Sequence, residues 1–156
     1  MNFYKSIILG IIMILVSSLS IQAQDYKTFY NVDDSKIALQ GYSPVSYVDL
    51  GLAQRGSKSI KSEHEGIAYY FTSEDQKAAF DKNPEKYLPQ YGGWCATGIG
   101  VGAKFRTDPN KFLLRNGKLY LFLYSMEVDA LELWKKDEAK LTASANKNWK
   151  KLQSTH

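Results

Sequence analysis

Cysteine is almost absent from this sequence, since Cys95 is the only one among 156 residues. No disulfide can therefore form within the chain. Histidine is nearly as scarce, because His156 is the last residue and His64 is the only one inside the region expected to fold. Zinc usually takes four nitrogen, sulfur or oxygen ligands, so this scarcity disfavours a tetrahedral zinc site.

Two catalytic or phosphate-binding patterns are also missing. The chain has no Gly-x-Ser-x-Gly sequence, which disfavours a serine hydrolase. Gly98, Gly100 and Gly102 alternate, but no Lys-Ser or Lys-Thr pair follows them, which excludes a phosphate-binding loop. No internal repeat divides the chain, so we expect one folded domain.

No apolar run reaches the roughly 20 residues that a membrane-spanning helix needs. The longest, residues 7–16, follows Lys5 and precedes the small residue Ala23, which is the pattern of a secretory signal peptide. We expect residues 1–23 to be removed and the protein to be exported to the periplasm or the extracellular medium. After cleavage no stable membrane insertion is expected; the alternative is a retained N-terminal anchor.

Charge is distributed unevenly along the chain. Residues 24–103 carry eight Lys and Arg against ten Asp and Glu, whereas residues 104–156 carry eleven against six. A basic segment can indicate nucleic-acid binding. These lysines, however, are spaced as on the solvated face of a helix, and the chain is expected to be exported. We therefore expect no nucleic-acid partner.

Two β-hairpins are predicted from turn sequences between apolar segments. The first covers residues 60–72, with Glu65-Gly66 as its turn. The second covers residues 111–124 and turns at Asn116-Gly117, because both central residues of a type I′ turn need positive φ. Residues 24–35 are polar and irregular, so the packed domain is expected to span residues 36–152.

Helices are predicted after each hairpin. Thr72 or Ser73 is the expected N-cap of a helix over residues 73–82, and Asn83-Pro84 begins a short one. Ser125 is the expected N-cap of a helical tail with a break near Asp137. The apolar face of this tail is Met126, Ala130, Leu133, Trp134, Leu141, Ala145, Trp149 and Leu152. The predicted fold class is α+β, a small single domain with antiparallel β-hairpins packed against helices and a helical C-terminal tail.

Three segments together resemble the YHS domain. Residues 42–45 (Tyr-Ser-Pro-Val) resemble the Asp-Pro-Val sequence that opens the domain, and residues 66–73 (Gly-Ile-Ala-Tyr-Tyr-Phe-Thr-Ser) resemble its body, together with Phe80, Asn83-Pro84 and Tyr87. Residues 91–96 (Tyr-Gly-Gly-Trp-Cys-Ala), with the second hairpin and the tail, resemble the secreted subgroup of YHS proteins. Some members of that subgroup carry selenocysteine where Cys95 stands.

The resemblance implies a metal-handling module. YHS domains are similar to metal-sensing modules found beside copper pumps and in toluene-type monooxygenase subunits. Those modules typically carry cysteines just after the Asp-Pro-Val segment and just after the Tyr-Phe pair. Ser46 and Thr72 stand at these positions here, so Cys95 is the one thiol left for a soft metal.

Cys95 is the central candidate residue. An unpaired cysteine in an oxidising compartment must be buried, bound to metal, paired with another molecule or chemically active. Cu(I) tolerates fewer ligands than zinc and prefers sulfur, so copper held by Cys95 with His64 or Met126 is the least demanding metal site. The simpler alternatives are an exposed loop for His64, which stands between two glutamates, and an apolar core position for Met126.

An aromatic cleft near Cys95 is the second predicted site. Tyrosine keeps a polar hydroxyl when its ring is buried, so Tyr42, Tyr70, Tyr91 and Trp94 are expected to line a small-ligand pocket. Three functions stay open. They are a soft-metal or small-ligand binding module centred on Cys95, a thiol redox protein that uses Cys95, and a structural or interaction domain with Cys95 in its core. We favour the first, and we lean towards a protein that is not an enzyme.

Overall fold

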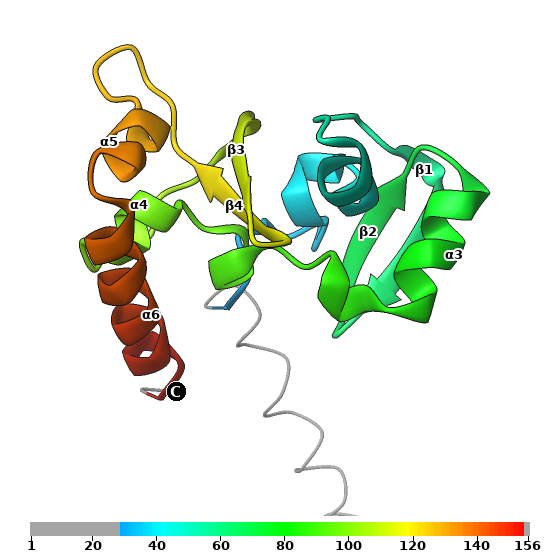
Figure 1. The fold of residues 1–156 in the computed structure, drawn as a ribbon. Helices are drawn as coiled ribbons and strands as arrows, with labels where there is room; N and C mark the ends of the chain where they lie inside the picture. Colours follow the sequence, from blue (N-terminus) through cyan, green and yellow to red (C-terminus); the bar gives the residue numbers. More distant parts are fainter. Residues whose placement is uncertain (1–28, 155–156) are drawn as a thin grey trace, which may run out of the picture.

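The computed structural model describes residues 29–154 and has the α+β architecture predicted from the sequence (Figure 1). The predicted signal peptide lies outside the described residues. The helices and strands are β1 (Ser57–His64), β2 (Ile67–Phe71), α3 (Glu74–Lys82), α4 (Ala96–Gly100), β3 (Asp108–Arg115), β4 (Lys118–Phe122), α5 (Ala130–Lys136) and α6 (Glu138–Ser154). Short helical turns lie between them: η1 (Ala38–Gly41), η2 (Ser46–Leu50), η3 (Pro84–Lys86) and η4 (Gln90–Gly93).

Both predicted hairpins are confirmed. β1 pairs antiparallel with β2, and β3 with β4. Glu65 and Gly66 have φ angles of 51° and 75°, and Asn116 and Gly117 have φ angles of 53° and 71°. Positive φ at both central residues is what a type I′ turn requires, because its twist matches that of the flanking strands.

The buried apolar side chains of residues 29–154 form two hydrophobic cores. The first core lies among β1, β2, α3 and the turns η1 and η2, and its largest members are Tyr47, Tyr69, Phe71, Phe80 and Tyr87. The second core joins α4, α5 and α6, and its largest members are Tyr91, Trp94, Tyr120, Phe122 and Trp134. Figure 1 shows the β3–β4 hairpin between these two groups of elements.

Strand β4 contributes to both cores. Successive side chains of a strand point to opposite faces, so Leu119 and Leu121 reach the first core, whereas Tyr120 and Phe122 reach the second. On β3, Phe112 and Leu114 pack against the first core and Leu113 against the second. The hairpin is therefore a wall shared by the two cores.

Helix α3 begins at the predicted place. Ser73 is its N-cap, and the Ser73 hydroxyl accepts a hydrogen bond from the Gln76 backbone N–H. The Gln76 side chain in turn bonds the hydroxyls of Ser43 and Ser46, both fully buried, which attaches the start of η2 to α3. The short helix expected after Asn83 is the 3₁₀ turn η3.

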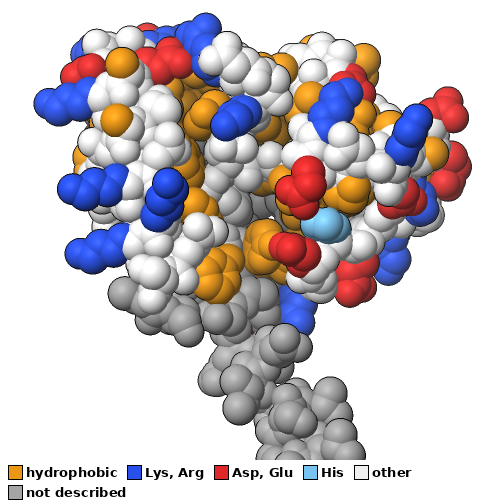
Figure 2. Space-filling view, turned by 60° about the horizontal axis from the view of Figure 1, so that its bottom comes forward, with side chains coloured by type: hydrophobic (Ala, Val, Ile, Leu, Met, Phe, Trp, Pro, Cys, Tyr) orange, Lys and Arg blue, Asp and Glu red, His pale blue; other side chains and the backbone are white. Residues whose placement is uncertain are grey.

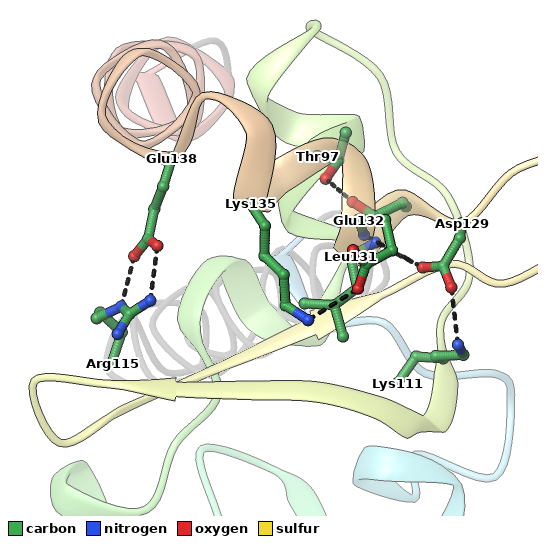
Figure 3. A network of polar contacts seen from close by, with 9 residues as sticks. Thr97, Lys111, Arg115, Asp129, Leu131, Glu132, Lys135 and Glu138 are labelled. Carbon is green, nitrogen blue, oxygen red and sulfur yellow. Dashed lines mark hydrogen bonds and ion pairs between the residues drawn. The ribbon is translucent and has the colours of Figure 1, made fainter.

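Helix α5 begins at Ala130, so the prediction that Ser125 caps it is wrong. The Asp129 carboxylate is the N-cap and accepts hydrogen bonds from the backbone N–H groups of Leu131 and Glu132. Ser125 closes a separate turn by accepting from the Val128 N–H. Asp129 is further fixed by an ion pair of 2.8 Å with Lys111 of β3 (Figure 3), a contact that local sequence does not reveal.

The predicted break at Asp137 is confirmed, because α5 ends at Lys136 and α6 begins at Glu138. Trp134 and Ala145 are buried and Trp149 is partly buried against the second core, as expected for the apolar face. Two predicted members of that face are not buried: Met126 is fully exposed in the turn before α5, and Leu133 is 44 % exposed. Across residues 29–154, no helix has the length and apolarity that crossing a membrane requires.

Candidate functional site

Cys95 lies in the second core and is only 1 % exposed. It is the N-cap of α4, which begins close to the helix start predicted near Trp94. Its sulfur accepts hydrogen bonds from the backbone N–H of Gly98, at 3.5 Å, and from that of Leu123, at 3.2 Å. The second bond reaches the residue after β4. The thiol therefore links α4 to the central hairpin and is shielded from solvent.

The glycines before Cys95 allow another backbone segment to come close. Gly92 has a φ of 59°, and a Cβ atom placed there would overlap the Phe29 carbonyl oxygen. The Asn31 backbone N–H donates to the Gly92 carbonyl at 2.8 Å, and the Asn31 side chain donates to the Gly93 carbonyl at 2.9 Å. Val32 is buried in the first core. Packing thus begins ahead of Lys36, where we expected the domain to start.

The predicted cleft residues fall into two groups. Tyr91 and Trp94 lie in the second core together with Cys95. Tyr42 packs against the first core, with the Arg55 guanidinium 5.3 Å from the centre of its ring. Tyr70 is half-buried on β2 and lies against η1, where it is the neighbour that a Cβ atom on Gly41 would meet. Of these four side chains, Tyr91 lines the cleft described below, and Tyr42, Tyr70 and Trp94 do not.

The three predicted metal ligands lie in different surroundings. His64, at the end of β1, has its ring centre 6.3 Å from that of Phe80 in the first core, and its Nε2 atom is 3.4 Å from the Glu85 carboxylate. Cys95 belongs to the second core, and Met126 is in the exposed turn before α5. Within residues 29–154, no group of three or more His, Cys, Asp or Glu side chains is placed to hold a metal ion.

A cleft of about 890 Å³ opens where the two cores meet. Its volume lies within the range of about 300–1,000 Å³ that is usual for small-molecule sites. The first-core side contributes Tyr30, Glu65, Tyr69 and Glu85, and the second-core side contributes Tyr91 and the α6 residues Asn146, Trp149 and Lys150. In Figure 2, hydrophobic side chains lie between a side that carries acidic residues near the histidine and a side that carries lysines.

The polar groups of the first-core side are held in position by one another. The Tyr30 hydroxyl donates a hydrogen bond to the Glu65 carboxylate. Burial, followed by this hydrogen bond and the charges of Glu65 and Glu85, raises the pKa of the Tyr30 phenol. Burial also raises the pKa of Tyr69, with smaller contributions from Tyr30, Glu65 and Glu85. Both phenols are therefore uncharged donors at neutral pH.

The second-core side presents an aromatic pair and an amide. The ring centres of Tyr91 and Trp149 are 6.1 Å apart in an edge-to-face arrangement. The Tyr91 hydroxyl donates to the Asn146 side-chain oxygen at 3.0 Å, and burial raises the pKa of this phenol. The two α6 side chains are thus fixed against η4, which carries Tyr91.

Sequence reasoning found only Tyr91 among these cleft residues. One signal for the others was present: Asn146, Trp149, Lys150 and Gln153 follow the spacing i, i+3, i+4 and i+7 of one helix face. Of these four residues, only Trp149 was assigned to the apolar packing face of the tail. Tyr30 lay in the segment expected to be irregular, and Glu65 was identified only as a turn residue.

Three comparisons with known proteins gave no match: no family model, no curated protein and no solved structure corresponds to this chain. The YHS resemblance therefore stays a prediction from the sequence.

Proposed function

We propose that the protein is a binding module for a small molecule, which occupies the cleft between the two cores. The observation that carries this proposal is the cleft of about 890 Å³, whose lining combines aromatic rings with about as many polar side chains. Binding sites typically combine apolar walls with a small number of positioned donors and acceptors. Here the Tyr30–Glu65 and Tyr91–Asn146 hydrogen bonds fix such groups on opposite sides.

This proposal moves the binding site away from Cys95. The thiol is almost fully buried and already accepts two backbone hydrogen bonds, which favours the alternative of a structural cysteine. Copper binding and thiol redox chemistry at Cys95 remain predictions from the sequence, and either requires the second core to open. A thiol reagent should react slowly with the native protein and rapidly in denaturant. Equal rates in the two conditions would show that the thiol is accessible.

The copper prediction has a separate test. Reduced protein and Cys95→Ser are each titrated with Cu(I) against a competing chelator. If Cys95 is a ligand, the parent protein retains copper and the folded variant loses it. Equal retention would show that the sulfur is not a ligand, and no retention by either would end the copper hypothesis.

The cleft is tested with small neutral aromatic probes, phenol and indole, titrated into the protein and followed by NMR chemical shifts. We expect shifts at the Trp149 indole N–H and the Gly92 amide, and none at the buried Trp94 indole. Trp149→Ala, followed at the Gly92 amide, should weaken binding about tenfold, because an aromatic pair contributes roughly 0.5–1.5 kcal/mol beyond the area it buries. Tyr124→Ala is the matched control, since Tyr124 is 48 % exposed and does not line the cleft. Probes that shift no cleft resonance, or bind Trp149→Ala unchanged, would contradict the proposal.

A further inference from the structure

We infer that the ligand of this cleft is an organic cation, a small molecule with an ammonium group on an apolar body. The inference rests on the proposed binding function and adds the chemical class of the ligand. It follows from how charge and aromatic rings are placed on the two sides of the cleft.

The first-core side of the cleft is acidic. Glu65 stands in the β1–β2 turn and Glu85 in η3, and both line the cleft. The partner of Glu65 is the hydroxyl of Tyr30, an uncharged donor, so this hydrogen bond does not neutralise the carboxylate. The negative charges of both glutamates act on the tyrosines that line the cleft, because both charges contribute to raising the pKa of the Tyr30 and Tyr69 phenols.

The second-core side supplies aromatic rings that complement a cation, of which Trp149 is half-buried and Tyr91 is 5 % exposed. Tyr91 and Trp149 are fixed edge to face, with ring centres 6.1 Å apart. An ammonium group within about 6 Å of a tyrosine or tryptophan face is attracted by the ring quadrupole. A ligand between the two sides thus meets carboxylates on one and aromatic rings on the other. A neutral ligand of the same shape would lack the electrostatic attraction to the carboxylates.

Two basic side chains lie in or beside the cleft. His64 lies 3.4 Å from Glu85, and Lys150 lines the cleft from α6. His64 is not among the residues that line the cleft. Lys150 is exposed on a long flexible side chain and stands on the α6 side, whereas Glu65 and Glu85 stand on the other. Lys150 should therefore weaken cation binding without preventing it.

The experiment compares choline with its uncharged isostere, in which carbon replaces the quaternary nitrogen. Both are titrated under identical conditions and followed by the NMR shifts of Gly92 and the Trp149 indole. We expect choline to bind about tenfold more tightly than the isostere. The double variant Glu65→Gln/Glu85→Gln keeps the side-chain shape and a hydrogen-bond acceptor at each position. It should bind choline about tenfold more weakly than the parent protein and bind the isostere with unchanged affinity. Lys150→Gln should improve choline binding about twofold to threefold.

The other outcomes separate this inference from the proposed function. If choline and the isostere bind the cleft equally, or the double variant retains full choline affinity, the cation inference is wrong and the binding function stands. If neither compound binds the cleft but phenol does, the cation inference is again wrong and the proposed binding function stands. If phenol also leaves the cleft resonances unshifted, both the inference and the proposed function are wrong.

Discussion

The backbone at Gly92 shows how one residue positions a site. Its positive φ turns η4, and its missing side chain lets the Phe29 carbonyl pack directly on it. Both the N-terminal segment and the cleft lining depend on this contact, because Gly92 and Tyr91 are neighbours in η4.

Gly92→Ala is expected to be far more destabilising than Gly66→Ala. Gly66 also has positive φ, at 75°, but a Cβ atom there would have no neighbour within 4 Å. Gly66→Ala should therefore lower the free energy of unfolding only by the cost of holding an alanine at positive φ, about 1–2 kcal/mol. Gly92→Ala adds overlap with backbone, and we expect a loss of more than about 3 kcal/mol in the free energy of unfolding. Urea unfolding measures both, and equal losses would show that the contact with Phe29 is unimportant.

Cys95 and Met126 show what residue type alone can and cannot indicate. The sequence predicts both as soft ligands, because sulfur is the donor that Cu(I) prefers. Their surroundings differ completely, since Cys95 is buried and hydrogen-bonded while Met126 is fully exposed. Burial is set by contacts with residues far along the chain, such as Leu123 for Cys95, so composition could not distinguish the two.

At the scale of elements, the start of α5 combines a local cap with a long-range ion pair. Asp129 caps the helix and Lys111 of β3 holds its carboxylate, and Arg115 similarly pairs with Glu138 of α6 at 2.7 Å (Figure 3). These two pairs attach the C-terminal helices to the central hairpin. Lys111 also lies 4.3 Å from the centre of the Tyr124 ring.

Substituting Asp129 should separate its capping role from its charge. Asp129→Ala removes both and should cost about 1–2 kcal/mol in the free energy of unfolding. Asp129→Asn keeps an acceptor for the cap and should cost less than Asp129→Ala, because it removes only the charge of a half-buried ion pair. The hydrogen bond from Lys111 lowers the pKa of Asp129 in the folded protein. The contribution of its charge is therefore present above the ordinary aspartate pKa of about 4 and is lost as the pH falls below it.

Urea unfolding at about pH 7 and about pH 3 measures this dependence. The difference between the parent and Asp129→Asn should shrink at the lower pH. A difference that stays constant would show that the ion pair with Lys111 does not affect stability.

Short-range signals predicted the elements well, and they could not predict the cleft. Asn116-Gly117 and Ser73 each act within a few residues, so both hairpin and helix were found from the sequence. Ser125 was a wrong N-cap because the Asp129 carboxylate accepts the hydrogen bonds from the first backbone N–H groups of α5. The cleft brings Tyr30 and Trp149 to one cavity. No local pattern encodes that meeting, since it depends on how the two cores pack against β3–β4.

At the scale of the whole molecule, buried tyrosine hydroxyls connect stability to alkaline pH. Burial raises the pKa of Tyr47 and Tyr69 in the first core and of Tyr91 in the second. The Tyr47 hydroxyl also donates to the Pro109 carbonyl at 2.7 Å, which joins η2 to β3. A phenol whose pKa is raised on folding contributes stability that is complete below the unfolded pKa of about 10. That stability is lost as the pH rises towards the folded value.

The free energy of unfolding should therefore fall steeply above about pH 10, by up to about 1.4 kcal/mol per pH unit for each such tyrosine. Tyr47→Phe removes one titrating group and should flatten this decline, while costing about 1 kcal/mol at neutral pH through its lost hydrogen bond. The exposed Tyr124→Phe is the control and should change neither. Denaturant unfolding across pH measures the slopes, and an unchanged slope in Tyr47→Phe would contradict the assignment.

Because the side chains of β4 alternate between the two cores, the chain cannot be cut into two fragments that fold independently. A cut after Gly93 would assign most of the first core to one fragment, yet Leu119 and Leu121, which complete that core, would belong to the other. The C-terminal fragment alone would expose the Leu119 and Leu121 side of β4 to water, and the N-terminal fragment alone would expose the part of the first core that these residues cover. Neither fragment should therefore fold by itself. Mixed together, the fragments would have complementary surfaces for reassembly. The two cores therefore fold as one unit and cannot be separated into two domains. For the same reason, the two fragments could be fused to two other proteins, and their reassembly would report that those proteins are close together.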